Sequence, residues 1–325
     1  YYKDIKIPYE ITREDMMVTA GASEGMVIAT AMVTDPGDDI LVFEPFYAPY
    51  LTYAHFMNVN LIPVALTSEN NFHLPSKEEI VKKITPKTKA IFFTNPNNPT
   101  GTVFTKEEMQ LILDIAREYH LFVVSDETYR GMVFDKKESL SLLHITTENT
   151  VNNVIVVDSL SKRLNVCGAR MGLVMSKNRD LMSAASRFAM GIPYAAYLDQ
   201  EIVAPMLADC LDYVQWLSNE YQNRRDVFIK TLSDVLQTSI HQPEGAFYVM
   251  LALPIDDAST FAKWMLTDFE QDKETVMVSP GAGFYATPEK GKNEVRIAYI
   301  LNEDDLKKAA TLLAEGVKQY NKTHK

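Results

Sequence analysis

The sequence predicts an α/β fold in which helices sandwich a mostly parallel sheet, followed by a smaller C-terminal α+β domain. Over the first two thirds of the chain, short and almost continuously apolar runs alternate with helical patterns. Runs of this kind are typical of strands that are buried on both faces of a parallel sheet. Beyond a helical region at 198–237 the pattern changes, because strand-like segments are then separated by loops and helices.

The elements follow in chain order from these patterns. Strand-like runs of the first part cover 14–20, 39–45, 59–66, 88–95, 121–127, 154–161 and 170–176. Between them, helical spacing and cap residues indicate helices at 24–34, 47–58, 75–84 and 105–120. The later strands are 245–253, 275–280 and 294–300, and an amphipathic helix at 302–322 closes the chain. We therefore predict a large domain over 1–232 and a small domain over 233–325.

Composition excludes several classes of protein. The 325 residues carry 32 Lys and Arg against 43 Asp and Glu, a net charge of −11 with no basic run, so we expect neither nucleic acid nor an anionic membrane as partner. Two cysteines and six scattered histidines form no metal motif, so no metal is predicted. No apolar run is long enough to cross a membrane and no signal peptide opens the chain. These features predict a cytoplasmic protein.

The chain opens with "YYKDIKIPYE", which has the pattern of the middle of a helix. We therefore expect that an N-terminal segment precedes it in the complete protein.

Polar clusters come directly after several predicted strands. They read "GASE" at 21–24, "NPNNPTG" at 95–101, "DETY" at 126–129 and "SLSK" at 159–162. Ligands of parallel α/β sheets bind at the carboxyl ends of the strands. The four clusters therefore predict one site at that edge of the sheet.

The first cluster allows two interpretations. Residues 21–25 fit the G-x-S-x-G pattern of a serine hydrolase, with a strand before and a helix after Ser23. That reading needs an Asp and a His later in the chain, and Asp158 and His241 satisfy the order. The same turn could instead offer the amides of a helix N-terminus to a phosphate, which an acidic protein must bind by local groups.

The cluster at 95–101 favours the second interpretation. Asn, Pro and Gly dominate turns, so a plain turn would explain the composition alone. The full string N-P-x-N-P-T-G, however, closely resembles the signature loop of the class I and II pyridoxal-phosphate aminotransferases of fold type I, which include aspartate aminotransferase. Further segments resemble that family in chain order: "EPFYAPY" (44–50), "SDETYRG" (125–131), "SLSKRLNVCGARMG" (159–172) and "EVRIAYI" (294–300). The resemblance spans nearly the whole chain and implies the fold-type-I large domain.

The resemblance implies a role for each catalytic side chain. Lys162 would form a Schiff base with pyridoxal 5′-phosphate and, as a free amine, move the proton at the substrate's α-carbon. Asp126 would keep the ring nitrogen protonated, which the cofactor needs to accept electrons. Tyr129 and Asn98 would donate hydrogen bonds to the phenolic oxygen of the ring, and Tyr47 would stack on its face.

Binding of the two anionic groups is also implied by resemblance. The phosphate would lie at the turn that enters the helix at 24–34 and be held by Ala22, Ser23, Ser159, Ser161 and Arg170. The α-carboxylate of the substrate would be clamped by Arg296, a planar cation that can bind it through two hydrogen bonds, with Asn98 beside it.

The resulting prediction is an aminotransferase that moves an amino group from an L-amino acid to a 2-oxo acid and works as a homodimer. Aspartate is one candidate substrate, although Ser23 stands where some aspartate-specific relatives have a lysine. A β C–S lyase or an aminocyclopropanecarboxylate synthase would share nearly all of these contacts and stays open as an alternative. A serine hydrolase that uses Ser23 is a more distant alternative, and so is a catalytically silent regulatory module.

Overall fold

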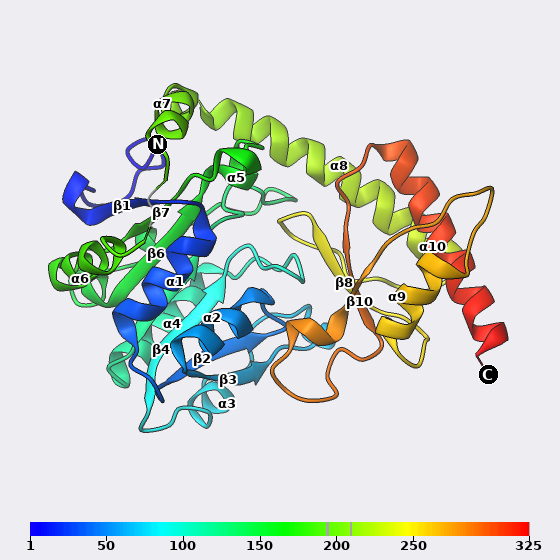
Figure 1. The fold of residues 1–325 in the computed structure, drawn as a ribbon, viewed down its shortest axis with the longest axis horizontal. Coiled ribbons are helices and arrows are strands. Elements are labelled where there is room, and N and C mark those ends of the chain that lie inside the picture. The colour runs from blue at the N-terminus through cyan, green and yellow to red at the C-terminus, as the bar shows by residue number, and fades with distance from the viewer. Residues whose placement is uncertain (193–194, 209, 325) are drawn as a thin grey trace.

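The computed structural model describes residues 1–192, 195–208 and 210–324 of the chain. Figure 1 shows two sheets in separate halves of the molecule, with a long helix, α8 (Cys210–Leu236), running from one half to the other. The larger sheet has seven strands and the smaller one has three. This arrangement confirms the predicted large α/β part followed by a smaller α+β part.

The large sheet is mostly parallel. Its strands are β1 (Met16–Thr19), β2 (Asp39–Glu44), β3 (Asn60–Ala65), β4 (Thr88–Thr94), β5 (Phe122–Asp126), β6 (Val154–Ser159) and β7 (Gly172–Met175), in the spatial order β1-β7-β6-β5-β4-β2-β3. Strands β2 to β6 pair in parallel, and β7 runs antiparallel to both of its neighbours, β6 and the edge strand β1, so that β1 points in the same direction as β2 to β6. The carboxyl ends of β4, β5 and β6 therefore meet at one edge of the sheet.

Helices cover both faces of this sheet, as predicted. They are α1 (Ala22–Val33), α2 (Pro49–Met57), α3 (Lys77–Val81), α4 (Lys106–Glu118), α5 (Leu160–Arg163) and α6 (Arg179–Ala189). Strand β4 shows how alternation sorts the faces. Its Ile91 and Phe93 pack in one core with α3 and α4, whereas Ala90 and Phe92 pack in the other with α1, α2 and α6.

The smaller half is built on an antiparallel sheet. It contains β8 (Tyr248–Ala252), β10 (Glu294–Ala298) and the short β9 (Ser279–Pro280), with helices α9 (Ala258–Thr267) and α10 (Glu303–Thr323). Its core joins Phe228 and Leu232 of α8 to Val249 of β8 and Leu313 of α10. The predicted boundary between residues 232 and 233 falls inside α8 and stays a prediction.

Two predicted elements differ from the structure. The helical region 198–237 is divided into α7 (Tyr197–Val203), a 3₁₀ turn at Pro205–Leu207, and α8. Pro205 has no backbone N–H and its ring crowds the preceding turn, so the helix ends there. The strand predicted at 275–280 is reduced to Ser279 and Pro280, because only these residues pair with β10.

Candidate active site

The predicted cofactor residues meet in one cavity at the carboxyl ends of β5 and β6. The cavity has a volume of about 130 Å³. Its lining includes all but one of the ten predicted residues, namely Ala22, Ser23, Tyr47, Asp126, Tyr129, Ser159, Ser161, Lys162 and Arg170. The tenth, Asn98, is a direct neighbour, since its Nδ2 donates to the Tyr129 hydroxyl at 3.3 Å. Residues from five separate segments of the sequence thus converge on one small space.

One wall of the cavity is the start of α1. Gly21 precedes the helix with a φ of 83°, in the left-handed region that glycine adopts without strain. A Cβ at this position would lie 2.5 Å from Nη2 of Arg170, which itself donates to the backbone oxygen of Ala20 at 3.2 Å. The missing side chain therefore lets the guanidinium lie against the turn. Together they present helix N–H groups and a cation to the same space.

A pair of serines stands opposite this turn. Ser159 ends β6 and caps α5, since its Oγ accepts from the Ser161 N–H at 3.1 Å. The Ser159 hydroxyl also contacts Ser161 Oγ at 3.0 Å and the Met171 carbonyl at 3.1 Å. The two hydroxyls are therefore fixed at the N-terminal end of α5, the short helix that carries Lys162.

Asp126 is a buried carboxylate at the end of β5, with 4% of its surface exposed. One of its oxygens accepts from the N–H and the hydroxyl of Thr128, at 3.0 and 2.7 Å. Burial raises the pKa of Asp126 to about 6 against those hydrogen bonds, and the charges of Asp158 and Glu127 add to the rise. A cation placed opposite this carboxylate would stabilise its ionised form and lower its pKa.

Lys162 lies half-buried in α5, the single helical turn that follows β6. Its Nζ is 3.5 Å from Sγ of Cys167 and 5.7 Å from the centre of the Phe247 ring. Tyr47 lines the same cavity with its ring perpendicular to that of Tyr50. Burial raises the pKa of Tyr47, with the charge of Asp126 adding to the effect, so this phenol stays neutral.

The predicted carboxylate clamp lies next to this cavity. Arg296, on β10, donates through Nη1 to Oδ1 of Asn98 at 3.1 Å and through Nη2 to Ser279 at 3.4 Å. Its guanidinium lies 4.4 Å from the ring centre of Tyr248, and its Nε is buried without a partner in the described part of the chain. A half-buried, incompletely paired guanidinium is suited to receive a carboxylate.

Sequence reasoning missed Tyr248. Its hydroxyl accepts from that of Tyr129 at 3.2 Å, which closes a ring of contacts through Asn98 and Arg296. In the sequence Tyr248 belongs to an apolar run, "GAFYVMLAL", that reads as a plain buried strand. Alternation along that strand was the available signal, because it places Tyr248 and Met250 on one face and Phe247 and Val249 on the other.

The residues nominated for a serine hydrolase have other partners. Asp158 pairs with Arg130 and Arg163, and Nδ1 of His241 contacts Asn71. Burial lowers the pKa of His241 to about 4. The structure does not join these two residues to Ser23, so the triad is wrong.

Two searches of the described residues bear on other classes of protein. Within 1–192, 195–208 and 210–324, no helix combines the length and apolar character that a bilayer crossing requires. In the same ranges, His, Cys, Asp and Glu side chains form no group of three that could hold a metal ion.

Known proteins share this fold and these motifs. Residues 6–313 match the family described as aminotransferase class I and II. The chain is 30% identical to the aspartate aminotransferase of Pyrococcus horikoshii over 310 residues, which cover 94% of this chain and 76% of the relative. It is 28% identical to a probable aspartate/prephenate aminotransferase of Aquifex aeolicus, with 98% and 78% covered. The structure of Thermus thermophilus aspartate aminotransferase with maleate matches with a TM-score of 0.85 at 25% identity, covering 96% and 78%.

The fold is thus that of the fold-type-I aminotransferases. The chain belongs to the class I and II aminotransferase family and is a transaminase, as its motifs predicted.

Proposed function

We propose that this aminotransferase binds pyridoxal 5′-phosphate in the cavity at the ends of β5 and β6 and attaches it to Lys162. One observation carries the proposal. A lysine, a buried carboxylate and a helix N-terminus, which come from distant parts of the sequence, line the same small space. A lysine can bind the aldehyde of the cofactor, a carboxylate can face its basic ring nitrogen, and a helix N-terminus can bind its phosphate.

The donors fit the cofactor group by group. The N–H groups at the start of α1, the hydroxyls of Ser23, Ser159 and Ser161, and the guanidinium of Arg170 suit a phosphate. The absence of a Cβ at Gly21 keeps that guanidinium in place. Asn98 and Tyr129 offer hydrogen bonds to a ring oxygen, and Tyr47 supplies an aromatic face.

Asp126 and Lys162 would have separate roles in the reaction. Bound in this cavity, pyridoxal phosphate supplies an electron sink for the bonds of the substrate's α-carbon. The Asp126 carboxylate holds a proton on the ring nitrogen, which is a stronger effect in a buried setting than in water. Lys162 Nζ, as a free amine, would take the proton from the α-carbon of the substrate as general base and would give a proton back as general acid.

The proposed substrates are an L-amino acid and a 2-oxo acid, each held by its carboxylate between Arg296 and Asn98. The unpartnered Nε of Arg296 and its bond to Asn98 support this placement. The relatives named aspartate aminotransferase support aspartate as one substrate. Half-reactions with a panel of amino acids would test that choice and would separate amino transfer from β-elimination.

Reduction with borohydride tests the attachment directly. Protein reconstituted with pyridoxal phosphate and then reduced should carry the cofactor mass on the peptide that contains Lys162. The variant Lys162→Ala should carry none, whereas Lys177→Ala, which removes another partly buried lysine outside the cavity, should be labelled like the wild type. Label on a different lysine in the wild type would refute the proposal.

We also propose that the protein is a homodimer. Large apolar side chains lie exposed on α7 and at the start of α8, with Tyr197 72%, Leu198 73%, Ile202 65% and Trp216 58% exposed. Large apolar side chains exposed on successive helices mark a candidate interaction site. Sedimentation of Leu198→Asp/Ile202→Asp should show a monomer. Met277→Asp, at an equally exposed site on the other half, should leave the dimer intact.

A cytoplasmic location remains part of the proposal. Both cysteines are free thiols, which supports a reducing compartment. Cell fractionation would test it.

A further inference from the structure

Four charged side chains are buried directly behind the proposed cofactor cavity. They are Glu127, Arg130, Asp158 and Arg163, each at most 2% exposed, and we call them the Asp158 cluster. The two carboxylates and two guanidinium groups balance in charge. None of the four lines the cavity itself.

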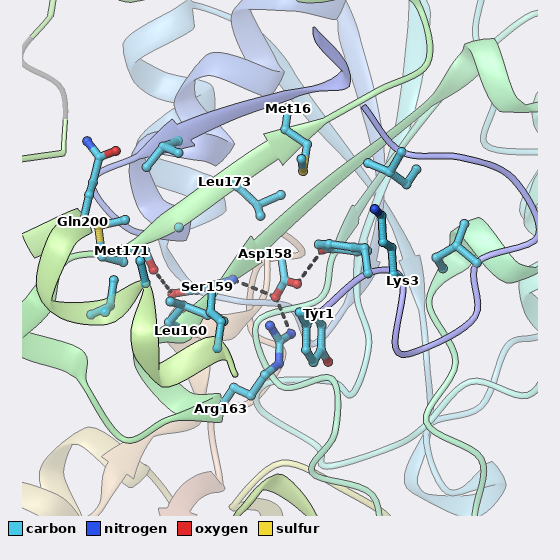
Figure 2. A pocket seen from close by; sticks show the side chains of 18 of the residues that line it. Tyr1, Lys3, Met16, Asp158, Ser159, Leu160, Arg163, Met171, Leu173 and Gln200 are labelled. Atoms are coloured by element: carbon cyan, nitrogen blue, oxygen red, sulfur yellow. Dashed lines mark hydrogen bonds and ion pairs between the residues drawn. The ribbon is translucent and has the colours of Figure 1, made fainter. Parts of the chain in front are cut away.

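Asp158 is the centre of the cluster. Its carboxylate accepts from Arg130 Nη2 at 2.7 Å, from Arg163 Nη2 at 2.5 Å and from the hydroxyl of Tyr2 at 2.6 Å. In Figure 2 the guanidinium of Arg163 points at this carboxylate, and Tyr1 lies beside it. Arg130 lies in the loop after β5, and Arg163 lies in α5, the helical turn after β6. Asp158 therefore links these two segments.

Glu127 is the second carboxylate of the cluster. Glu127 forms an ion pair with Arg130, with 2.7 Å between Oε2 and Nε, and its other oxygen accepts from the hydroxyl of Ser141 and the N–H of Leu142. Arg130 is thus paired with two carboxylates, Glu127 and Asp158. The planar guanidinium fixes direction as well as distance.

Every member of the cluster is the chain neighbour of a residue in the cavity. Glu127 follows Asp126, Arg130 follows Tyr129, Asp158 precedes Ser159, and Arg163 follows Lys162. Asp158 and Ser159 are neighbours on β6 and so project to opposite faces of the sheet. Glu127 and Arg130 lie just after β5, and Arg163 lies in α5, so their ion pairs act on the backbone next to the cavity residues. A shift in any of these ion pairs would move the adjacent site residue.

Stability alone does not explain four buried charges. The cost of removing charges from water is so large that apolar residues of similar volume often stabilise a protein as well or better. What the ion pairs add is a fixed geometry between two loops. A site whose groups must be held to within about half an ångström of their working positions depends on that geometry.

We propose that Asp158 is a positioning residue: through Arg130 and Arg163 it holds Asp126, at the end of β5, and Tyr129, in the loop after it, at a fixed separation from Lys162 in α5. The proposal rests on the proposed function, because it assigns Asp158 a part in attaching the cofactor to Lys162. It adds a residue that touches neither cofactor nor substrate.

The chain offers a matched control. Asp15 is also fully buried and also pairs with two cations, Lys177 at 2.9 Å and Arg179 at 3.3 Å, but none of its neighbours lines the cavity. Asp158→Asn and Asp15→Asn therefore remove the same charge from similar surroundings. Loss of stability should be common to both variants, and loss of positioning should be confined to Asp158→Asn.

The first measurement is hydrogen exchange in the cofactor-free protein. Asp158→Asn should speed amide exchange in both loops, 127–131 and 159–164, whereas Asp15→Asn should speed it around residues 12–19. Faster exchange in only one of the two loops, or in neither, would overturn the proposal. This arm needs no cofactor, so it decides the question even if the proposed function fails.

The second measurement is a double-mutant cycle with Lys162→Ala, read as the affinity for pyridoxal phosphate. If Asp158 positions Lys162, Asp158→Asn should weaken binding about tenfold more when Lys162 is present than when it is replaced by alanine. An equal loss in both backgrounds would show a merely structural role and overturn the proposal. Failure of wild-type protein to attach the cofactor at Lys162 would refute the proposed function instead.

A second variant serves if Asp158→Asn does not fold. Arg163→Lys keeps the charge but loses the planar, forked contact. It should give the same pattern of exchange and the same coupling to Lys162, at reduced size. Wild-type behaviour of a folded Arg163→Lys in both measurements would count against the proposal.

Discussion

Arg296 and Asn98 are bonded across the two halves of the molecule, with Nη1 of the arginine donating to Oδ1 of the asparagine at 3.1 Å. Arg296 belongs to the small sheet, and Asn98 to the loop that follows β4 of the large sheet. The bond holds a half-buried cation beside Asn98, which in turn donates to Tyr129 of the cavity, before any substrate is present. A substrate carboxylate would therefore meet groups contributed by both halves.

Arg296→Lys should weaken substrate binding and spare the cofactor. A lysine keeps the charge but loses the bidentate geometry. We expect KM for the amino acid to rise about 100-fold, with the affinity for pyridoxal phosphate changed less than about threefold. Steady-state kinetics and cofactor titration would measure both. Arg224→Lys, which alters an arginine outside the cavity, should leave KM unchanged, and an unchanged KM in Arg296→Lys would refute the clamp.

Asp126→Asn should stabilise the cofactor-free protein at neutral pH. The carboxyl pKa rises from 3.8 to about 6 on folding, so the folded state disfavours the ionised form. This cost is absent below about pH 3.8, grows as the pH rises, and is complete above about pH 6, where it is about 3 kcal/mol. Urea unfolding at pH 4 and pH 7 should show the variant more stable only at pH 7. Equal stability at both values would contradict the prediction, and cofactor binding should weaken in the same variant.

Gly21→Ala should damage the anion-binding turn, and Gly37→Ala provides its control. Both glycines have φ in the left-handed region, 83° and 92°, so each alanine should cost about 1–2 kcal/mol of stability. Only at Gly21 does the new Cβ collide, at 2.5 Å from Arg170, whereas Gly37 has open space. Cofactor affinity should therefore fall in Gly21→Ala alone. Equal affinity in the two variants would argue against a phosphate site at this turn.

His73→Gln should lower stability in a defined pH window. His73 lies between Glu108 at 3.0 Å and Glu244 at 3.4 Å, and these carboxylates raise its pKa to about 9. A raised histidine pKa stabilises the fold fully below the unfolded value of about 6.5, and the gain is lost as the pH rises through 9. The difference in unfolding free energy between wild type and variant should follow that course. His55→Gln, at an exposed histidine, should show no such trend.

The partner carboxylate sets the lower limit of that window. Hydrogen bonds from His73 and Lys137 hold the pKa of Glu244 at about 2, despite its burial. Its contribution is present above about pH 4.5 and is lost as the pH falls toward 2. Stabilisation by the pair should therefore be greatest between about pH 4.5 and 6.5. A flat difference across this range and up to pH 9 would show that His73 and Glu244 are not coupled.

Much of the fold could be predicted because most of its strands have a clear apolar pattern in the sequence. The middle of a run such as 88–95, residues 90–93, is apolar throughout and fits a sheet that is buried on both faces. The shortening of the strand at 275–280 was not predicted, because it depends on pairing with β10, which lies farther along the chain. The break near Pro205 was not predicted, although its cause, the proline itself, is local. The antiparallel direction of β7 was not predicted, because it depends on how this strand pairs with β6 and β1.

Some residues of the candidate site could be predicted from the sequence, and others could not. Lys162, Asp126 and Asn98 belong to dense polar motifs at strand ends, so position in the sequence pointed to them. Tyr248 lies within a run that looks like ordinary core. Glu127, Arg130 and Arg163 lie inside the same motifs as Asp126 and Lys162, but only their tertiary contacts with Asp158 give them a role. Charged residues such as Arg130 and Arg163 are usually exposed, and nothing in the sequence marked these two as buried.

The burial of Asp126 has a consequence outside the reaction. Without a cation opposite it, this carboxylate weakens the fold, and a bound pyridinium would both remove that weakness and add its own binding energy. Under the proposed function, the amount of folded protein in a cell would follow its supply of vitamin B6. A shortage would then reduce the number of enzyme molecules as well as the share that is loaded, since protein that unfolds more often is degraded sooner.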